Sequence, residues 1–364
     1  MTGILRRVPI APKTVTSGPF WSDAKSLIER EAVTPIVGNF MSAALVGGDL
    51  AAMAESWANE EPVLDAYERK DLTRVAQFFS VQQRNRRETK NEYLGVLKEI
   101  LYATALEDDA LDDQLKEELR DDPASIFPLS VSEFARKLSY PRFTNPNQNP
   151  LRLLAELPLS IFITTCHHDF LEHALASTGT KQAVSEILYW DQALESIPSI
   201  YDVEPDYKPT TTRPLVYHLF GRDSYPESLV LTEDDHLDCL VKLSELRGQV
   251  NVSNPQARAR TIPTEVRTAL STHALLLLGY DVHHWDFRVL FRGMILGMGA
   301  GRVSNPNVPR GICMQLDPLG GNVDLCRQVK DHFERYFDKS HFDVFWGDEL
   351  KCVRALCALS KGGH

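Results

Sequence analysis

The segment LPLSIFITTCHHDFLE, residues 157–172, constrains the fold of this chain more than any other stretch. Its β-branched and apolar run at residues 161–165 is typical of a buried strand of about five or six residues. Polar side chains follow where that strand must stop, namely Thr164, Thr165, Cys166, His167, His168 and Asp169. We expect a helix to begin near Asp169, since an acidic residue suits a helix N-terminus and the next apolar residues share one face. Ligands bind at such strand ends in open α/β sheets, so this segment predicts the functional site.

Short apolar runs alternate with helical patterns along the rest of the chain. We predict strands at residues 34–38, 185–190, 214–221, 273–280, 311–317 and 341–347. We predict helices at residues 22–32, with Ser22 as the N-cap, and at residues 232–246, 262–270, 323–337 and 349–359. This alternation indicates an α/β fold with a mainly parallel sheet and helices on both faces. The hydrophobic content of 43% allows one such domain with an embellishment, or two domains.

A helical segment interrupts this pattern near the start. Residues 71–105 lack proline and place apolar side chains at helical spacings around a polar middle, so we expect one long helix or two. The acidic residues 106–122 are typical of a solvated helix face. A turn-rich stretch, FTNPNQNP, then precedes the sheet-forming part. We therefore predict a helical insertion, or subdomain, over residues 50–150.

Charge and cysteine usage narrow the classes of function. The formal net charge of −11 disfavours a nucleic-acid groove or an anionic membrane surface as the main partner. No apolar run approaches the ~20 residues that cross a bilayer. The cysteines never form a C-x-x-C pair, so a disulfide framework or a structural metal site is not expected, and a reducing cytoplasm fits best. They are Cys166, Cys239, Cys313, Cys326, Cys352 and Cys357.

The first predicted strand ends in a glycine turn. The TPIVG strand at residues 34–38 runs into Gly38, and a helix is expected from Asn39 to Leu45. A strand, a glycine turn and a helix start together can cradle a phosphate. A single glycine is also ordinary at a turn, so both interpretations stay open.

Five segments in this order resemble one family. They are PIVG, ELPLSIFITT, YHLFG followed by PESLVLTEDD, LLLLGYDVHHWDFRVLF, and FWGDE. Together they resemble the sirtuin-like domain of prokaryotic conflict systems, in a subgroup with the HLFG spelling. The resemblance implies a single Rossmann-like domain over residues 1–364 that holds NAD, as substrate or ligand, or an ADP-ribose relative. It also implies NAD hydrolysis in antiphage defence and assembly as a homo-oligomer or with a defence partner. The zinc-ribbon cysteines of sirtuin deacetylases have no counterpart, so deacetylation is not expected.

The chain departs from that family where the chemistry occurs. In the glycine turn of the family, G-A-G-x-S, Gly38 and Ser42 keep the ends while Asn39, Phe40 and Met41 replace the middle. Cys166 stands where active relatives have an asparagine, and His168 where they have an acid. The catalytic histidine of the family falls on Phe220, a residue with no proton to transfer.

Other side chains offer substitutes. His167 and His168 can act as bases at neutral pH if they face the cleft, although each can instead cap the helix or bond to the backbone. In a strand, His218 would share a face with Phe220, roughly 7 Å further back. Cys166 beside two histidines offers a thiol nucleophile, but adjacent residues rarely give the geometry that a Cys and His pair needs. The candidate catalytic residues are therefore Cys166, His167, His168 and His218.

The candidate cofactor-binding residues lie at the ends of predicted strands. They are Gly38, Asn39, Ser42, Thr164, Thr165, Phe220, Gly221, Gly279, Tyr280, Asp317, Trp346, Gly347 and Asp348. Two functions remain: a divergent NAD glycohydrolase-type effector, or a catalytically inactive module that senses a nucleotide or assembles with a separate effector. Release of nicotinamide from NAD would distinguish them.

Overall fold

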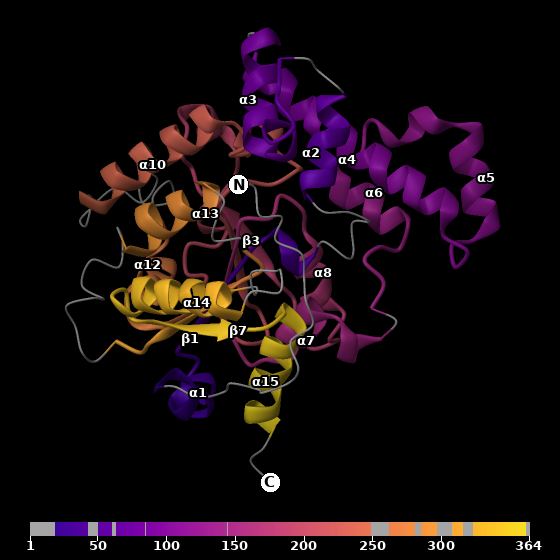
Figure 1. Cartoon of the computed structure of the whole chain (residues 1–364). Coiled ribbons are helices and arrows are strands. Elements are labelled where there is room, and N and C mark those ends of the chain that lie inside the picture. Colours follow the sequence, from indigo (N-terminus) through magenta and orange to yellow (C-terminus); the bar gives the residue numbers. More distant parts are fainter. Residues whose placement is uncertain are drawn as a thin grey trace.

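The protein is built on a seven-stranded sheet (Figure 1). The computed structural model describes residues 19–42, 50–59, 63–83, 85–143, 145–248, 262–280, 285–296, 308–315 and 323–361. The strands are β1 Val33–Val37, β2 Ile161–Thr164, β3 Val184–Ile187, β4 Leu215–His218, β5 Ala274–Leu278, β6 Gly311–Gln315 and β7 Phe342–Trp346. Their spatial order is β3-β4-β2-β1-β5-β6-β7, and each neighbouring pair is parallel. This confirms the predicted α/β fold.

Helices cover both faces of the sheet, because its strands are apolar on both sides. Along β5, Ala274, Leu276 and Leu278 belong to one buried cluster, whereas Leu275 and Leu277 belong to another. The first cluster contains residues of α1 Pro19–Glu29, α7 Pro150–Glu156, α8 Phe170–Ala176 and α15 Glu349–Lys361. The second contains residues of α10 Glu233–Gly248, α12 Thr264–Thr272, α13 Trp285–Val289, the π-helix η8 Leu290–Leu296 and α14 Val323–Asp338. Such two-sided burial is typical of parallel sheets.

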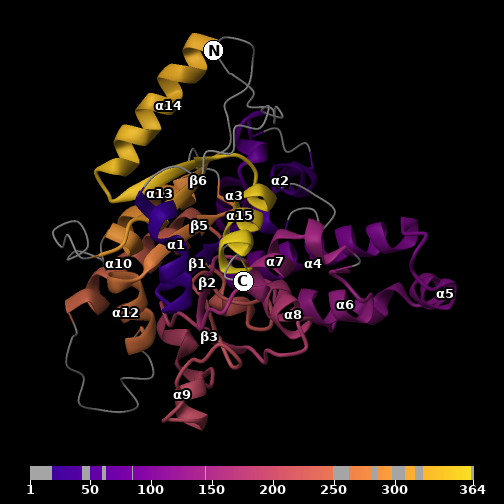
Figure 2. The same ribbon diagram turned by 90° about the horizontal axis from the view of Figure 1, so that it is seen from below.

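The chain between β1 and β2 is mainly helical. It contains α2 Leu50–Ala58, α3 Leu72–Gln83, α4 Arg86–Glu107, α5 Asp113–Asp121 and α6 Val131–Lys137, which we call the insertion helices. The segment expected as one helix or two is two, because the Asn85 side chain accepts hydrogen bonds from the Arg87 and Glu88 amides and starts α4. The insertion helices extend to one side of the sheet in Figures 1 and 2.

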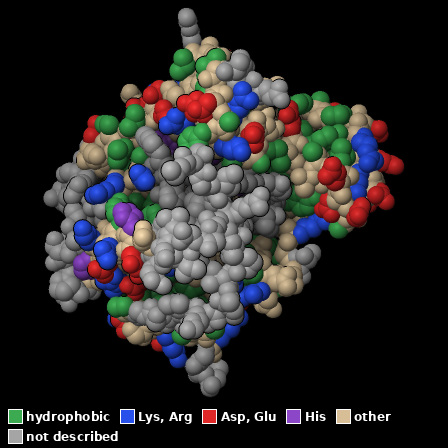
Figure 3. All heavy atoms as spheres, in the orientation of Figure 1, with side chains coloured by type: hydrophobic (Ala, Val, Ile, Leu, Met, Phe, Trp, Pro, Cys, Tyr) green, Lys and Arg blue, Asp and Glu red, His purple; other side chains and the backbone are tan. Residues whose placement is uncertain are grey.

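The remaining helical elements are short. They are η1 Asn39–Met41, η3 Glu68–Lys70, η4 Pro123–Ile126, η5 Pro146–Gln148, η6 Gln192–Ser196, α9 Ile200–Val203 and η7 Pro226–Ser228. Acidic and basic side chains are intermingled over the described part of the face seen in Figure 3. Among the described residues, no helix combines the length and apolarity that crossing a bilayer requires.

Two local predictions were wrong. Helix α1 begins at Pro19, not after Ser22, because proline suits the first turn of a helix; the Ser22 hydroxyl donates to the Pro19 carbonyl inside that turn. Strand β4 ends at His218, so Phe220 lies beyond it and the two side chains do not follow the face rule of a strand. The chain turns there because Gly221 adopts a φ of +81° and packs against the Ser228 backbone, where a Cβ would lie 2.2 Å from the carbonyl oxygen.

Candidate functional site

The order in which successive strands are added to the sheet reverses between the neighbouring strands β1 and β5. It continues from β1 toward β2 on one side, and from β5 toward β6 on the other. Ligands bind outside the carboxyl ends of the strands at such a switch point. The predicted turn at Gly38 and the predicted pair Gly279 and Tyr280 both lie there, one after each strand.

Two glycines let these turns meet backbone to backbone. The Gly38 amide donates to the Leu278 carbonyl at 2.8 Å, and a Cβ on Gly38 would lie 2.5 Å from the Gly279 oxygen. Gly279 has a φ of +78°, and a Cβ there would lie 2.6 Å from the Met41 nitrogen. Inside the first turn, the Met41 amide donates to Gly38 and the Ser42 amide to Asn39. Those two amides are therefore occupied within the turn.

Tyr280 spans the strand ends. Its ring lies against Gly38, and its hydroxyl is 3.0 Å from the Thr165 hydroxyl after β2. Thr164 works locally: its hydroxyl donates to the Val37 carbonyl and accepts from the Cys166 amide. The structure thus brings together the predicted residues of β1, β2 and β5.

A small cavity of about 40 Å³ opens beside these strand ends. Four predicted site residues line it: Asn39, Thr165, His167 and Phe220. The remaining lining residues are Lys70, Asp71, Leu72, Thr73, Val230, Leu231 and His236. Residues 70–73 run from the end of η3 into the first residues of α3, so this part of the chain between β1 and β2 closes one side of the cavity. At roughly 10–15 Å³ per water, the cavity has room for about three water molecules and is too small for a nucleotide.

His167 is the candidate catalytic side chain that reaches the cavity. Its Nδ1 lies 3.0 Å from the Tyr93 hydroxyl of α4, and the two rings meet edge to face. Its buried Nε2 makes no well-formed hydrogen bond with a described residue, although a weaker one with the Val230 backbone favours the protonated ring. Burial, reinforced by the neighbouring His168, His236 and His218, lowers the pKa of His167 to about 3. The ring is therefore neutral near pH 7.

His168 and Cys166 point elsewhere. The His168 Nε2 lies 3.1 Å from the Ser42 hydroxyl, and its ring stacks on Phe170 at 3.9 Å between centroids. Burial lowers the pKa of His168 to about 4. The Cys166 sulfur faces the Val37 carbonyl at 4.0 Å, and burial raises the pKa of this thiol to about 11. A thiolate nucleophile is thereby disfavoured at neutral pH.

His218 forms a buried pair with an acid that sequence reasoning missed. Its Nε2 lies 2.7 Å from the Glu172 carboxylate, and its Nδ1 lies 3.2 Å from the Cys166 carbonyl. The Ser185 hydroxyl donates to the same carboxylate oxygen at 2.7 Å. Burial would raise the pKa of Glu172, but His218, Arg222 and Ser185 outweigh it and hold that pKa at about 2. This pair links β4, α8 and β3 and is not among the residues that line the cavity.

The other predicted residues divide between the site and the sheet edge. The Phe220 ring meets the His236 ring edge to face at 5.1 Å between centroids, beside Gly221. Trp346 is the last residue of β7, which β5 and β6 separate from β1, and its indole donates to Glu334. Asp348, after Gly347, accepts from the Lys351 amide at the start of α15. The predictions for Asp317, and for the side chain of Phe40, lie outside the described residues.

Several residues of the site were not predicted. Tyr93 comes from α4, Asp71 from the link between η3 and α3, and His236 from α10, far along the chain from the strand ends they meet. Glu172 lies in the first turn of α8, and only the fold brings it to His218 of β4. Among the described residues, no cluster of three or more His, Cys, Asp or Glu side chains could hold a metal ion.

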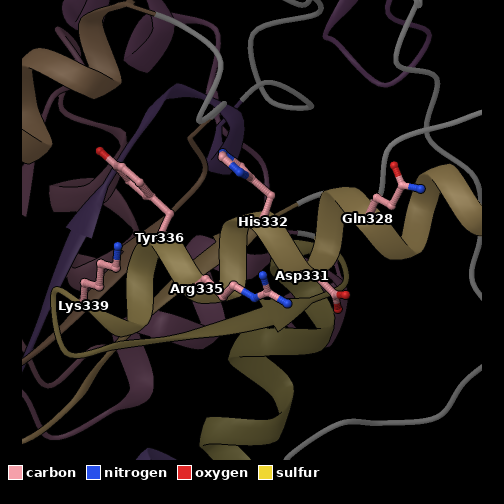
Figure 4. Close-up of a pocket in the computed structure, with 6 residues that line it drawn as sticks. All are labelled: Gln328, Asp331, His332, Arg335, Tyr336 and Lys339. Atoms are coloured by element: carbon pink, nitrogen blue, oxygen red, sulfur yellow. The ribbon is translucent and has the colours of Figure 1, made fainter.

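A larger hollow of about 500 Å³ runs along α14 (Figure 4). Its described lining comes from one helix and the residue after it, namely Gln328, Asp331, His332, Arg335, Tyr336 and Lys339. These side chains are exposed. They include no buried polar group that lacks a partner, so the smaller cavity at the strand ends remains the better candidate despite its size.

Comparison with known proteins agrees with the fold. No curated protein matches the chain. Residues 160–339 match the family model described as the SIR2-like domain. This span begins at β2 and ends just after α14, and it contains Thr165, His167 and Phe220. The matched part of the chain is therefore a SIR2-like, that is sirtuin-like, domain.

Proposed function

We propose that this protein binds NAD at the strand-end cavity and hydrolyses it, as a glycohydrolase-type effector of antiphage defence whose site is closed in the resting state. The family supports NAD as the nucleotide, since SIR2-like domains in general bind it as substrate or ligand. The role in defence follows the resemblance to domains of prokaryotic conflict systems. The single observation that supports the site best is the cavity in which Thr165, His167 and Asp71 converge.

The chemistry of NAD hydrolysis suits this set of side chains. The bond between the ribose C1′ and the nicotinamide nitrogen breaks, a water oxygen bonds to C1′, and one water proton is released. The ring nitrogen carries a positive charge in NAD, so nicotinamide leaves as a neutral molecule and requires no general acid. A carboxylate such as Asp71 would stabilise the oxocarbenium-like centre. Replacement of the family's histidine by Phe220 therefore removes one proton acceptor without removing this electrostatic contribution.

The closed cavity implies an activating movement. Ligand pockets usually measure roughly 300–1,000 Å³, far more than the space described here. Residues 70–73 would have to move away from the strand ends to admit a nucleotide. Assembly into a homo-oligomer, or contact with a defence partner, would supply that movement.

A second function, nucleotide sensing without turnover, is favoured by two observations. Phe220, which stands at the position of the family's catalytic histidine, follows β4 and lines the cavity, and Glu172 holds His218 outside the cavity. A protein of this kind would bind NAD or an ADP-ribose relative and pass the signal to a separate effector.

To test the two proposed functions, the purified protein is incubated with NAD and the released nicotinamide is measured. We expect release by the wild type after activation and a loss of about tenfold or more in Asp71→Asn. The matched control is Asp109→Asn, which changes an exposed carboxylate at the end of α4. If NAD raised the melting temperature of the protein without any release of nicotinamide, the sensing function would be supported and hydrolysis contradicted.

A further inference from the structure

The contact between Tyr93 and His167 joins the insertion helices to the strand end. Tyr93 lies in the middle of α4 and is 4% exposed, and His167 follows β2 and is 8% exposed. The Tyr93 hydroxyl lies 3.0 Å from Nδ1, and the interplanar angle of 88° fixes the imidazole against the phenol ring. Trp57 of α2 also packs against Tyr93, at 6.0 Å between ring centroids. Both rings are therefore held in place by packing.

This contact decides which nitrogen of His167 carries the proton. A phenol hydroxyl has one proton to donate, and Nδ1 is the only acceptor it meets among the described residues. Were Nδ1 protonated instead, the hydroxyl proton would be buried without an acceptor, which is unfavourable. With the hydroxyl donating to Nδ1, the proton of the neutral ring is on Nε2. That nitrogen is buried on a side chain that lines the cavity, where it makes no well-formed hydrogen bond and only a weaker one with the backbone of Val230, another lining residue.

We infer that Tyr93 is a positioning residue that fixes His167 as a hydrogen-bond donor, with Nε2–H directed at an oxygen of the bound nucleotide. The inference rests on the proposed nucleotide site and adds a specific role within it. His167 then recognises an acceptor oxygen, and removal of a proton from water falls to another group. The insertion helices become part of the recognition site through Tyr93.

The tautomer can be measured directly. In protein labelled with ¹⁵N histidine, with His167→Gln to assign the signals, we expect a protonated Nε2 and an unprotonated Nδ1 for His167. In Tyr93→Phe, which keeps the ring against Trp57, both nitrogens should shift toward a mixture of tautomers. Tyr102→Phe is the matched control, because its hydroxyl lies on the same helix and donates to the Leu119 carbonyl instead. A protonated Nδ1 in the wild type, or an unchanged spectrum in Tyr93→Phe, would overturn the inference.

Binding measurements connect the tautomer to recognition. We expect Tyr93→Phe to raise the Kd for NAD about tenfold while its melting temperature stays near that of Tyr102→Phe. An equal loss of affinity for NAD and ADP-ribose would place the acceptor oxygen on the ribose or phosphates, and a loss for NAD alone would place it on the carboxamide. Unchanged affinity for both would contradict the donor role. Absence of nucleotide binding by the wild type would instead refute the proposed function, and the tautomer experiment would still stand.

Discussion

The imidazole of His218 meets the carboxylate of Glu172 at 2.7 Å inside the protein, while its other nitrogen faces the Cys166 carbonyl at 3.2 Å. Both ring nitrogens thus point at acceptors, which requires a proton on each and makes the pair an imidazolium and a carboxylate. The pair fastens α8 to the end of β4. His218 is therefore held by partners within the fold and is not among the residues that line the cavity.

Removal of the acid should destabilise the fold. In Glu172→Gln the buried imidazolium loses its partner, so we expect the free energy of unfolding at pH 7 to fall by about 3 kcal/mol. Because the pKa of Glu172 in the folded protein, about 2, lies below its ordinary value of 4.5, this contribution is present above pH 4.5 and is lost as the pH falls toward 2. Urea titrations should show a smaller difference in the free energy of unfolding between the wild type and Glu172→Gln at pH 3 than at pH 7. Glu117→Gln on the exposed face of α5 is the control, and an equal loss there would contradict the assignment.

The two neighbouring histidines, His167 and His168, predict a separate loss of stability, which begins at a higher pH than that of Glu172 as the solution is acidified. Burial lowers the pKa of His167 to about 3 and that of His168 to about 4, whereas the unfolded chain takes up these protons near pH 6.5. The unfolded state therefore binds more protons below pH 6.5, and stability should fall by about 1.4 kcal/mol per pH unit for each histidine. Denaturation curves from pH 7 to pH 5 would measure this slope. It should flatten in the double variant His167→Gln with His168→Gln and persist in His332→Gln, which changes an exposed histidine.

A buried ion pair holds α10 against the insertion helices. The Lys90 ammonium lies 3.3 Å from the Asp235 carboxylate, and their side chains are 4% and 0% exposed. Lys90→Met should cost about 3 kcal/mol of stability and speed hydrogen exchange in α3 and α4. Adding Asp235→Asn should recover part of that loss, since the buried charge is then removed. No recovery in the double variant would mean that the cost of Lys90→Met comes from packing alone.

Restoring the family's histidine should increase hydrolysis. Phe220→His would place an imidazole in the cavity beside His236, where it can accept a proton from water. We expect nicotinamide release to rise at least about tenfold, whereas Phe220→Leu, which adds no titratable group, should leave the rate unchanged. Equal rates in the two variants would argue that proton removal does not limit the reaction.

The sheet was readable in the sequence because its strands are short apolar runs with polar ends. β5 was predicted with its boundaries nearly correct, since every residue from Ala274 to Leu278 is buried. The end of β4 was not, because the turn at Gly221 depends on its packing against Ser228. The role of Tyr93 could not be predicted either. In the sequence it occupies an ordinary apolar position of a helix, and only the fold brings it to His167, 74 residues away.

Hydrogen exchange with and without NAD tests the central claim, that the nucleotide binds at the strand ends beneath the insertion helices. We predict that NAD slows exchange in residues 70–73, 165–167 and 230–236, which surround the small cavity, and leaves the larger hollow along α14 unchanged. Protection confined to residues 328–339, or no protection anywhere, would contradict the account.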